Sequence, residues 1–122
     1  MPVPILKQGS VLIASVQAAL TDRDLLQLKD ELAEKVGRFR SRGVIIDVTA
    51  LDVMDSFATR TLRGIAATAR LRGAQTVVVG MQPAVAITLV ELGLSLTGVR
   101  TALNVDKGMA LLREQVDAAG RV

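Results

Sequence analysis

The chain has 122 residues, and half of them are hydrophobic, which suits one domain with a core of ordinary size. It contains no Cys and no His, which excludes disulfides, thiol nucleophiles, imidazole bases and the usual zinc sites. The net charge is only +3, and Phe39 and Phe57 are the sole aromatic residues, so we expect no nucleic-acid partner. Ser, Thr, Asp, Glu and Lys remain for active chemistry.

The N-terminal stretch MPVPILKQGS has neither a basic opening nor an apolar run of signal-peptide length. We therefore expect no export signal and a cytoplasmic protein. The uncharged run over residues 73–90 approaches the length of a membrane span, but Gly80 and Pro83 interrupt it. This run is better explained by a strand, a turn and a helix, so we expect no membrane partner.

The first predicted element is a β-hairpin at the N-terminus. Two apolar patches, residues 4–6 and 11–16, lie on either side of a short polar segment that contains Gly9 and Ser10. Apolar runs separated by such a pair are typical of two strands joined by a tight turn. The pattern therefore predicts a hairpin whose turn is Gly9-Ser10.

An amphipathic helix is predicted next. Thr21 and Asp24 have the spacing of a capping box, with Asp in place of the preferred Glu. Apolar residues then recur at helical spacing as far as Phe39. The pattern predicts a helix over about residues 22–41, closed by Gly43.

The rest of the chain alternates between strands and helices. GVIIDVT and AQTVVVGM are short and apolar on both faces, which is typical of covered strands in an open sheet. The segment between them is helical in pattern, and a second helix has Pro83 in its first turn and Gly93 after its last. A weak strand, VRTAL, precedes a final helix that Asn104 can cap.

This order of elements predicts an α/β fold for residues 1–122 as a single domain. We expect a mixed central sheet of about four or five strands, mostly parallel in its centre, with about four helices packed on it and the N-terminal hairpin at one side.

The helix that follows GVIIDVT has distinct faces when it is turned by about 100° per residue. Its sheet-facing side comprises Ala58, Leu62, Ile65 and Ala69. The opposite, solvent side comprises Ser56, Arg60, Arg63 and Arg70. A third, uncharged flank comprises Phe57, Thr61, Gly64, Thr68 and Leu71, and its small and partly apolar character predicts a docking surface.

Ser56 lies at the start of this helix, where two roles are open to it. Either Asp55 or Ser56 can be the N-cap, a role worth about 1 kcal/mol. If Asp55 is the cap, the Ser56 hydroxyl is free to accept a phosphate, which carries about −1.5 to −2 charges and is favoured at a helix N-terminus. Arg60 is one turn away, and Asp52 is also close, so phosphorylation would change the local field without unfolding the chain.

Metal binding and catalysis are competing interpretations of the same region. Asp47, Asp52 and Asp55 end or follow a central strand, and such clusters bind magnesium in some phosphoryl-transfer enzymes. No matching Lys and no second acidic pair accompanies them, which disfavours catalysis. The chain has neither GxGxxG nor GxxxxGK[ST].

Thr88 is a second candidate phosphate acceptor, although its place in AVAITLV favours a local hydrogen bond on its own helix.

The stretches VIIDVTALDVMDSFATR and VVVGMQPAVAITLVELGL make the chain resemble a STAS domain, the fold of anti-sigma-factor antagonists, over essentially its whole length. Within that family, DSF together with the stretch over residues 80–112 resembles the small stressosome subunit of the RsbS type.

The resemblance implies a non-enzymatic protein without a cofactor or metal, whose Ser56 is phosphorylated by a switch kinase of the RsbT type and dephosphorylated by a phosphatase. It implies co-assembly with sensory STAS paralogues of the RsbR type, as a homo- and hetero-oligomer that holds the kinase until Ser56 is phosphorylated. We place the partner-binding surface at Asp52, Phe57, Arg60 and Arg63. Two alternatives stay open: a stand-alone anti-anti-sigma factor that binds an anti-sigma kinase, and a ligand-binding regulatory STAS domain.

Overall fold

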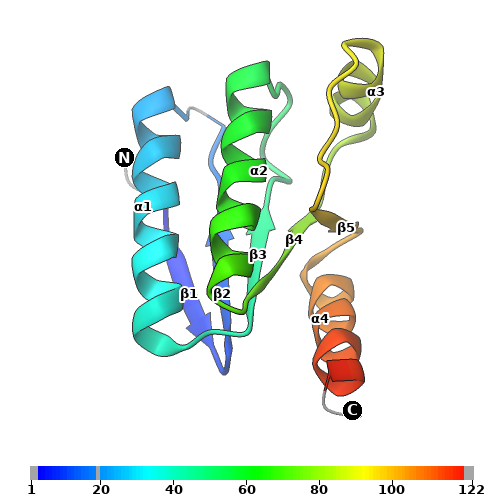
Figure 1. Ribbon diagram of the computed structural model, residues 1–122. Helices are drawn as coiled ribbons and strands as arrows, with labels where there is room; N and C mark the ends of the chain where they lie inside the picture. The colour runs from blue at the N-terminus through cyan, green and yellow to red at the C-terminus, as the bar shows by residue number, and fades with distance from the viewer. Residues whose placement is uncertain (1–2, 19, 120–122) are drawn as a thin grey trace.

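The structure is a computed structural model and describes residues 3–18 and 20–119. The strands are β1 (Ile5–Gln8), β2 (Val11–Ser15), β3 (Gly43–Asp47), β4 (Gln75–Val79) and β5 (Arg100–Ala102), and the helices are α1 (Asp22–Phe39), α2 (Ser56–Leu71), α3 (Pro83–Glu91) and α4 (Val105–Ala119). The five strands form one sheet in chain order, with β1 antiparallel to β2 and the other neighbours parallel (Figure 1). Over the described residues, the predicted mixed sheet with four helices is confirmed.

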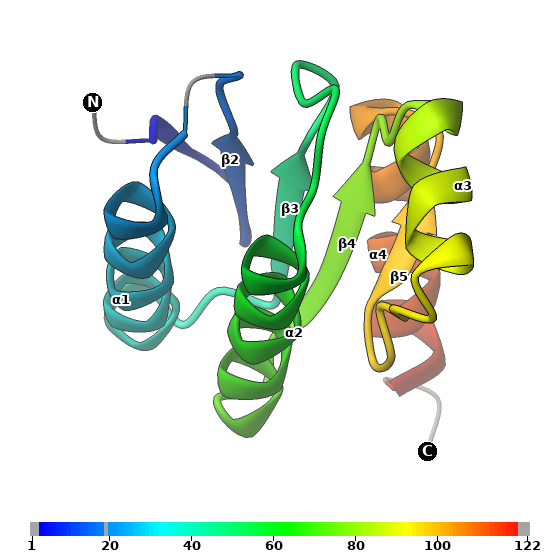
Figure 2. The same ribbon diagram turned by 90° about the horizontal axis from the view of Figure 1, so that it is seen from above.

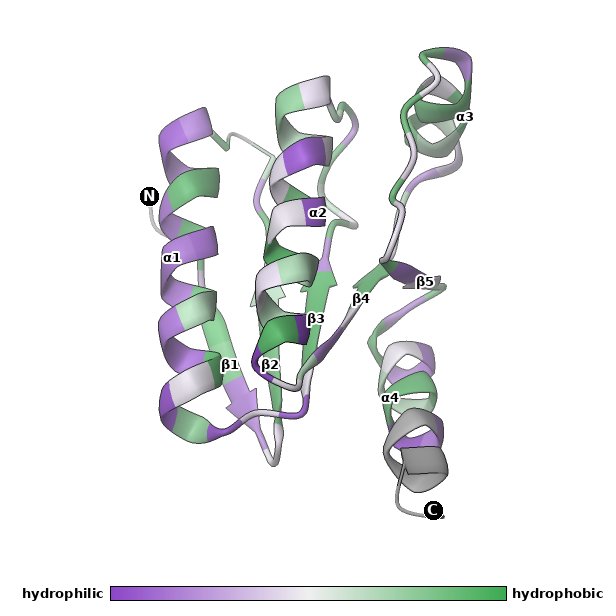
Figure 3. Ribbon diagram, in the orientation of Figure 1, coloured by the Kyte–Doolittle hydropathy of each residue, from purple (hydrophilic) through white to green (hydrophobic). Residues whose placement is uncertain are grey.

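The sheet separates two layers of helices. Helices α1 and α2 lie side by side on one face, and α4 lies on the other face (Figure 2). Because successive side chains of a strand point to opposite faces, Val44 and Ile46 join the core under α1 and α2, whereas Ile45 joins the core under α4. Burial on both faces accounts for the nearly continuous apolar runs of the central strands, which are green in Figure 3.

The N-terminal hairpin and the start of α1 have the predicted geometry. Gly9 has φ +60° in the turn between β1 and β2. The Thr21 side chain accepts a hydrogen bond from the Asp24 N–H, and an Asp24 carboxylate oxygen accepts one from the Thr21 N–H, each over 3.1 Å. The hydrogen bond from the Thr21 backbone lowers the pKa of Asp24. The predicted capping box is therefore confirmed.

The end of α1 differs from the prediction. The helix ends at Phe39, and Arg40, with φ 51° and ψ 45°, closes it by donating its N–H to the Val36 carbonyl. Gly43 is the first residue of β3 and is buried, with the Leu112 side chain of α4 directly over its Cα. The prediction that Gly43 closes the helix is wrong, because Arg40 adopts the left-handed conformation that a glycine usually provides and Gly43 makes room for Leu112.

The later helix boundaries agree with the sequence signals. Pro83 is the first residue of α3, and Gly93, with φ +68°, follows the helix end. The Asn104 side chain accepts a hydrogen bond from the Lys107 N–H over 2.9 Å at the start of α4. The expected roles of these three residues are therefore confirmed.

A polar tie, by which we mean the hydrogen bonds among Asp47, Thr49 and Gln82, connects the ends of β3 and β4. Asp47 Oδ1 accepts hydrogen bonds from the Thr49 N–H over 2.9 Å and from Thr49 Oγ1 over 2.6 Å. Gln82 Nε2 donates to the Thr49 carbonyl over 2.8 Å. Gly80 has φ +77°, and a Cβ added to it would overlap Thr49 Oγ1. The tie fixes the first residues of the segment that leads from β3 to α2.

We expect Gly80→Ala to lower the free energy of unfolding by roughly 3 kcal/mol, since it adds a collision with Thr49 to the cost of a left-handed alanine. Gly73→Ala is the matched control, because Gly73 has φ +86° but open space where a Cβ would lie. For the control, we expect the free energy of unfolding measured by urea denaturation to fall by about 1–2 kcal/mol. Equal losses for both variants would show that Thr49 adds nothing.

Candidate functional site

The candidate site lies at the edge of the sheet where the parallel strands end. β2, β3 and β4 run parallel, so their carboxyl ends share one edge. Residues 48–55 leave β3 at this edge and lead into α2, and α1 also begins there (Figure 1). This edge therefore brings Asp52, Asp55 and Ser56 to one end of the molecule.

Asp55 and Ser56 have different roles at the start of α2. Asp55 is the N-cap, with φ −85° and ψ −179°, and its Oδ1 accepts a hydrogen bond from the Ala58 N–H over 2.8 Å. Ser56 is the first helical residue and is exposed, and its hydroxyl makes no hydrogen bond within the described part of the chain. The cap is therefore Asp55, and the Ser56 hydroxyl stands free at the positive end of the helix.

The faces of α2 largely follow the predicted periodicity. Leu62, Ile65 and Ala69 are buried in the core, and Ala58 is half-buried against it. Arg60 is exposed on the same side as Ser56, and Arg63 is half-buried. The buried surface is wider than predicted, because Thr59, Thr61 and Ala66 are buried as well.

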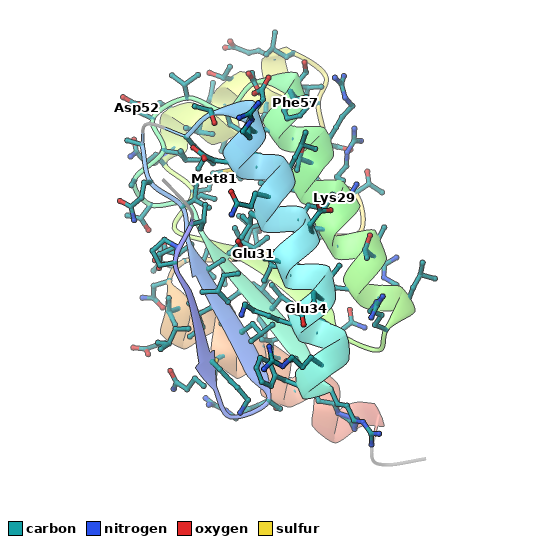
Figure 4. The ribbon with its side chains drawn as sticks, turned by 90° about the vertical axis from the view of Figure 1, so that its left-hand side faces the viewer. Lys29, Glu31, Glu34, Asp52, Phe57 and Met81 are labelled. Atoms are coloured by element: carbon teal, nitrogen blue, oxygen red, sulfur yellow. The ribbon has the colours of Figure 1, made fainter. Side chains whose placement is uncertain are left out.

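The uncharged flank of α2 is not a free docking surface along its length. Thr61 is only 6% exposed and donates its hydroxyl to the Phe57 carbonyl over 2.8 Å. A Cβ on Gly64 would lie 3.1 Å from Lys29 Nζ of α1. Figure 4 shows Lys29 between the two helices and Phe57 near the start of α2. The small residues of this flank allow α1 to approach α2 closely, so the prediction of a docking surface is wrong at the middle of the helix.

The remaining predicted residues lie in different places. Asp52 is exposed in the segment before α2 and lies at the same end of the molecule as Phe57, which is half-buried (Figure 4). Thr88 is exposed on α3, and its hydroxyl donates to the Ala84 carbonyl over 2.9 Å, the local hydrogen bond that its sequence context favours. Thr88 therefore lies on a different helix from Ser56, and its hydroxyl is already engaged.

Two of the three carboxylates considered as a magnesium site, Asp47 and Asp55, have structural partners. Asp47 accepts the two hydrogen bonds of Thr49, and Asp55 caps α2. Among the residues that the structure describes, no group of three acidic, His or Cys side chains is arranged to hold a metal ion.

A pocket beside Ser56 is not anticipated by the sequence pattern. It has a volume of about 190 Å³ and lies between residues 16–25, which lead into the first turn of α1, residues 48–55 and the first turns of α2. We call it the α1–α2 pocket, and its lining includes Leu20, Asp22, Leu51, Val53, Asp55 and Ala58. The only indication of this pocket in the sequence is that some residues in the connections between strands and helices are apolar. Val53 is one of them, and it is 73% exposed in the structure.

The fold is that of a STAS domain. The STAS domain family model matches residues 3–108, and the chain belongs to this family. None of the helices in the described residues has the length and apolar character needed to cross a membrane.

Three relatives place the chain more narrowly within the family. The structure of a serine-to-glutamate variant of Moorella thermoacetica RsbS is 40% identical, covers 94% of this chain and 97% of its own, and has a TM-score of 0.82. A chain of the stressosome, a signal integration and transduction hub, is 42% identical over 93% of this chain and 98% of its own, with a TM-score of 0.78. The RsbT co-antagonist protein RsbRA of Bacillus subtilis is 31% identical over 91 residues, which are 75% of this chain and 33% of that protein. The chain thus spans about a third of the length of this curated relative.

We expect Asp55→Ala to lower the free energy of unfolding by about 1 kcal/mol, because the Ala58 N–H loses its acceptor. Ser56→Ala should change it by less than about 0.5 kcal/mol, because its hydroxyl has no partner to lose. Urea denaturation of both variants measures the difference. A loss in Ser56→Ala as large as that in Asp55→Ala would contradict the assignment of the cap.

Proposed function

We propose that the chain is a non-enzymatic stressosome subunit of the RsbS type, cytoplasmic, with residues 1–122 forming its single domain and Ser56 serving as its phosphorylation switch. The observation that carries the proposal is the exposed Ser56 hydroxyl, free of hydrogen bonds within the described residues, next to a separate N-cap. The proposal is also supported by the 40% identity to RsbS over nearly the whole chain.

The start of α2 is suited to a phosphoserine. Asp55 uses its side chain on the Ala58 N–H, so the N–H groups of Ser56 and Phe57 remain for phosphate oxygens. The helix macrodipole favours the added negative charge at this end. Arg60 is exposed one turn further along α2 and offers a cation to the phosphate. Phosphorylation would therefore stabilise the helix start while changing the surface that partners meet.

The partners follow from the relatives. RsbRA is named as a co-antagonist of RsbT, so a chain that assembles with an RsbR-type paralogue would share in holding an RsbT-type kinase. The kinase would bind the unphosphorylated surface around Ser56. A phosphate there adds volume and about −1.5 to −2 charges beside Asp52 and Asp55, which opposes renewed close contact and releases the kinase. A phosphatase would restore the binding surface.

Incubation with an RsbT-type kinase and ATP should add a single phosphate, located at Ser56 by intact-mass and peptide analysis. Ser56→Ala should abolish the label, and Thr88→Ala should retain it. Mixing with an RsbR-type paralogue should give a particle far larger than a dimer by light scattering. A chain that stays monomeric or dimeric while binding a kinase would instead support a stand-alone antagonist.

In the phosphorylated chain, Arg60→Ala should lower the free energy of unfolding by about 0.5–1 kcal/mol, a typical value for an exposed ion pair. It should also raise the second pKa of the phosphate in a ³¹P NMR titration, because the neighbouring cation is lost. Arg63→Ala removes the same charge two turns from Ser56 and is the matched control. Equal phosphate titrations in the two variants would remove Arg60 from the site.

A further inference from the structure

The α1–α2 pocket adjoins Ser56 through a shared residue. Asp55 lines the pocket and directly precedes Ser56 in the chain, so their Cα atoms are about 3.8 Å apart. The exposed lining residues Asp22, Val53 and Asp55 mark the mouth, and Leu25 and Leu62 are buried walls. The mouth therefore opens beside the serine.

We propose that this pocket receives an aliphatic side chain, flanked by Lys or Arg, from the kinase that phosphorylates Ser56. The proposal rests on the proposed function, because it requires a kinase that acts on this serine. A kinase must bring its active site into contact with the Ser56 hydroxyl, and its surface then covers neighbouring Asp55. Kinase atoms consequently lie over the mouth of the pocket whenever Ser56 is positioned for reaction.

The walls of the pocket select an aliphatic side chain. Apart from Asp22 and Asp55, every described residue that lines the pocket is Val, Leu or Ala. A volume of about 190 Å³ leaves room for one large aliphatic group, which would displace water from apolar surface. Burial of such a side chain typically strengthens binding by about 10- to 100-fold.

The charge at the mouth of the pocket favours a basic residue next to the inserted side chain. Asp22 and Asp55 are exposed carboxylates, and no basic side chain is among the described residues that line the pocket. A Lys or Arg next to the inserted side chain would meet these carboxylates, whereas an acidic flank would be repelled. The pocket therefore fits an aliphatic side chain beside a basic residue better than one beside an acidic residue.

The first test fills the pocket from its rim. Ala18 is exposed and lines the pocket, so Ala18→Phe can occupy it without replacing a buried side chain. Ala67→Phe is the matched control, since Ala67 is exposed on α2 and lies outside the lining. Calorimetric titration of the full chain with an RsbT-type kinase should give at least about tenfold weaker binding for Ala18→Phe and an unchanged Kd for Ala67→Phe.

The second test removes charge from the mouth. Asp22→Asn should weaken kinase binding at low salt and reduce its dependence on salt, because one carboxylate of the mouth is lost. Asp30→Asn removes the same charge from an α1 position outside the lining, and it should leave both quantities unchanged. Thermal unfolding of each variant verifies the fold before titration.

The outcomes separate this proposal from the proposed function. If the wild-type chain binds the kinase and is labelled at Ser56 but both pocket variants bind as the wild type does, the pocket proposal is overturned and the proposed function stands. If Ala18→Phe abolishes assembly with the RsbR-type paralogue and leaves kinase binding intact, the pocket belongs to the paralogue and the proposal is also overturned. If the wild-type chain neither binds nor is labelled, the proposed function fails and the pocket proposal with it.

Discussion

The parallel pairing of β2, β3 and β4 is the constraint on which the rest of the structure depends. β3 is hydrogen-bonded on both edges and covered on both faces, by α1 and α2 on one side and by α4 on the other. Parallel neighbours cannot be joined by a tight turn, so the chain must cross back over the sheet through helices. Each crossing begins at the carboxyl edge, and the segments that start there are the ones free to carry function.

This constraint explains why a serine can be presented on a rigid support. The start of the segment that leaves β3 is fixed by the Thr49 hydroxyl, which donates to Asp47, and by the Thr49 carbonyl, which accepts from Gln82. Its end is fixed by the Asp55 cap. Ser56 thus follows two anchored points and begins a helix whose far face is buried. Its hydroxyl is exposed because the neighbouring residue, and not the serine, satisfies the helix N-terminus.

Local rules are enough to predict much of this arrangement. The hairpin turn, the Thr21 capping box, the cap at Asn104 and the exposed position of Ser56 depend on residues a few positions apart, and periodicity carries that information. The prediction for Gly43 fails because Arg40 closes α1 in a conformation that its residue type rarely adopts. The prediction for the flank at Gly64 fails because a small uncharged helix surface suits a partner protein and a neighbouring helix equally well. The α1–α2 pocket escapes sequence reasoning because its walls come from three segments that only the folded chain brings together.

The packing around Ser56 also restricts how a modification there can be detected. Thr59 and Leu62, in the next turns of α2, are buried, and Thr59 donates its hydroxyl to the Asp55 carbonyl. A phosphate added to an exposed first-turn residue meets free N–H groups and solvent. It therefore does not destabilise the helix start or shift the helix. Under the proposed function, the change would therefore lie in the charge and shape of the surface, and the partner that covers this surface would have to detect it. Because the Asp55 cap anchors the start of α2, a phosphate on Ser56 would be held at the same end of the molecule as Asp52 and the pocket mouth, one turn from Arg60.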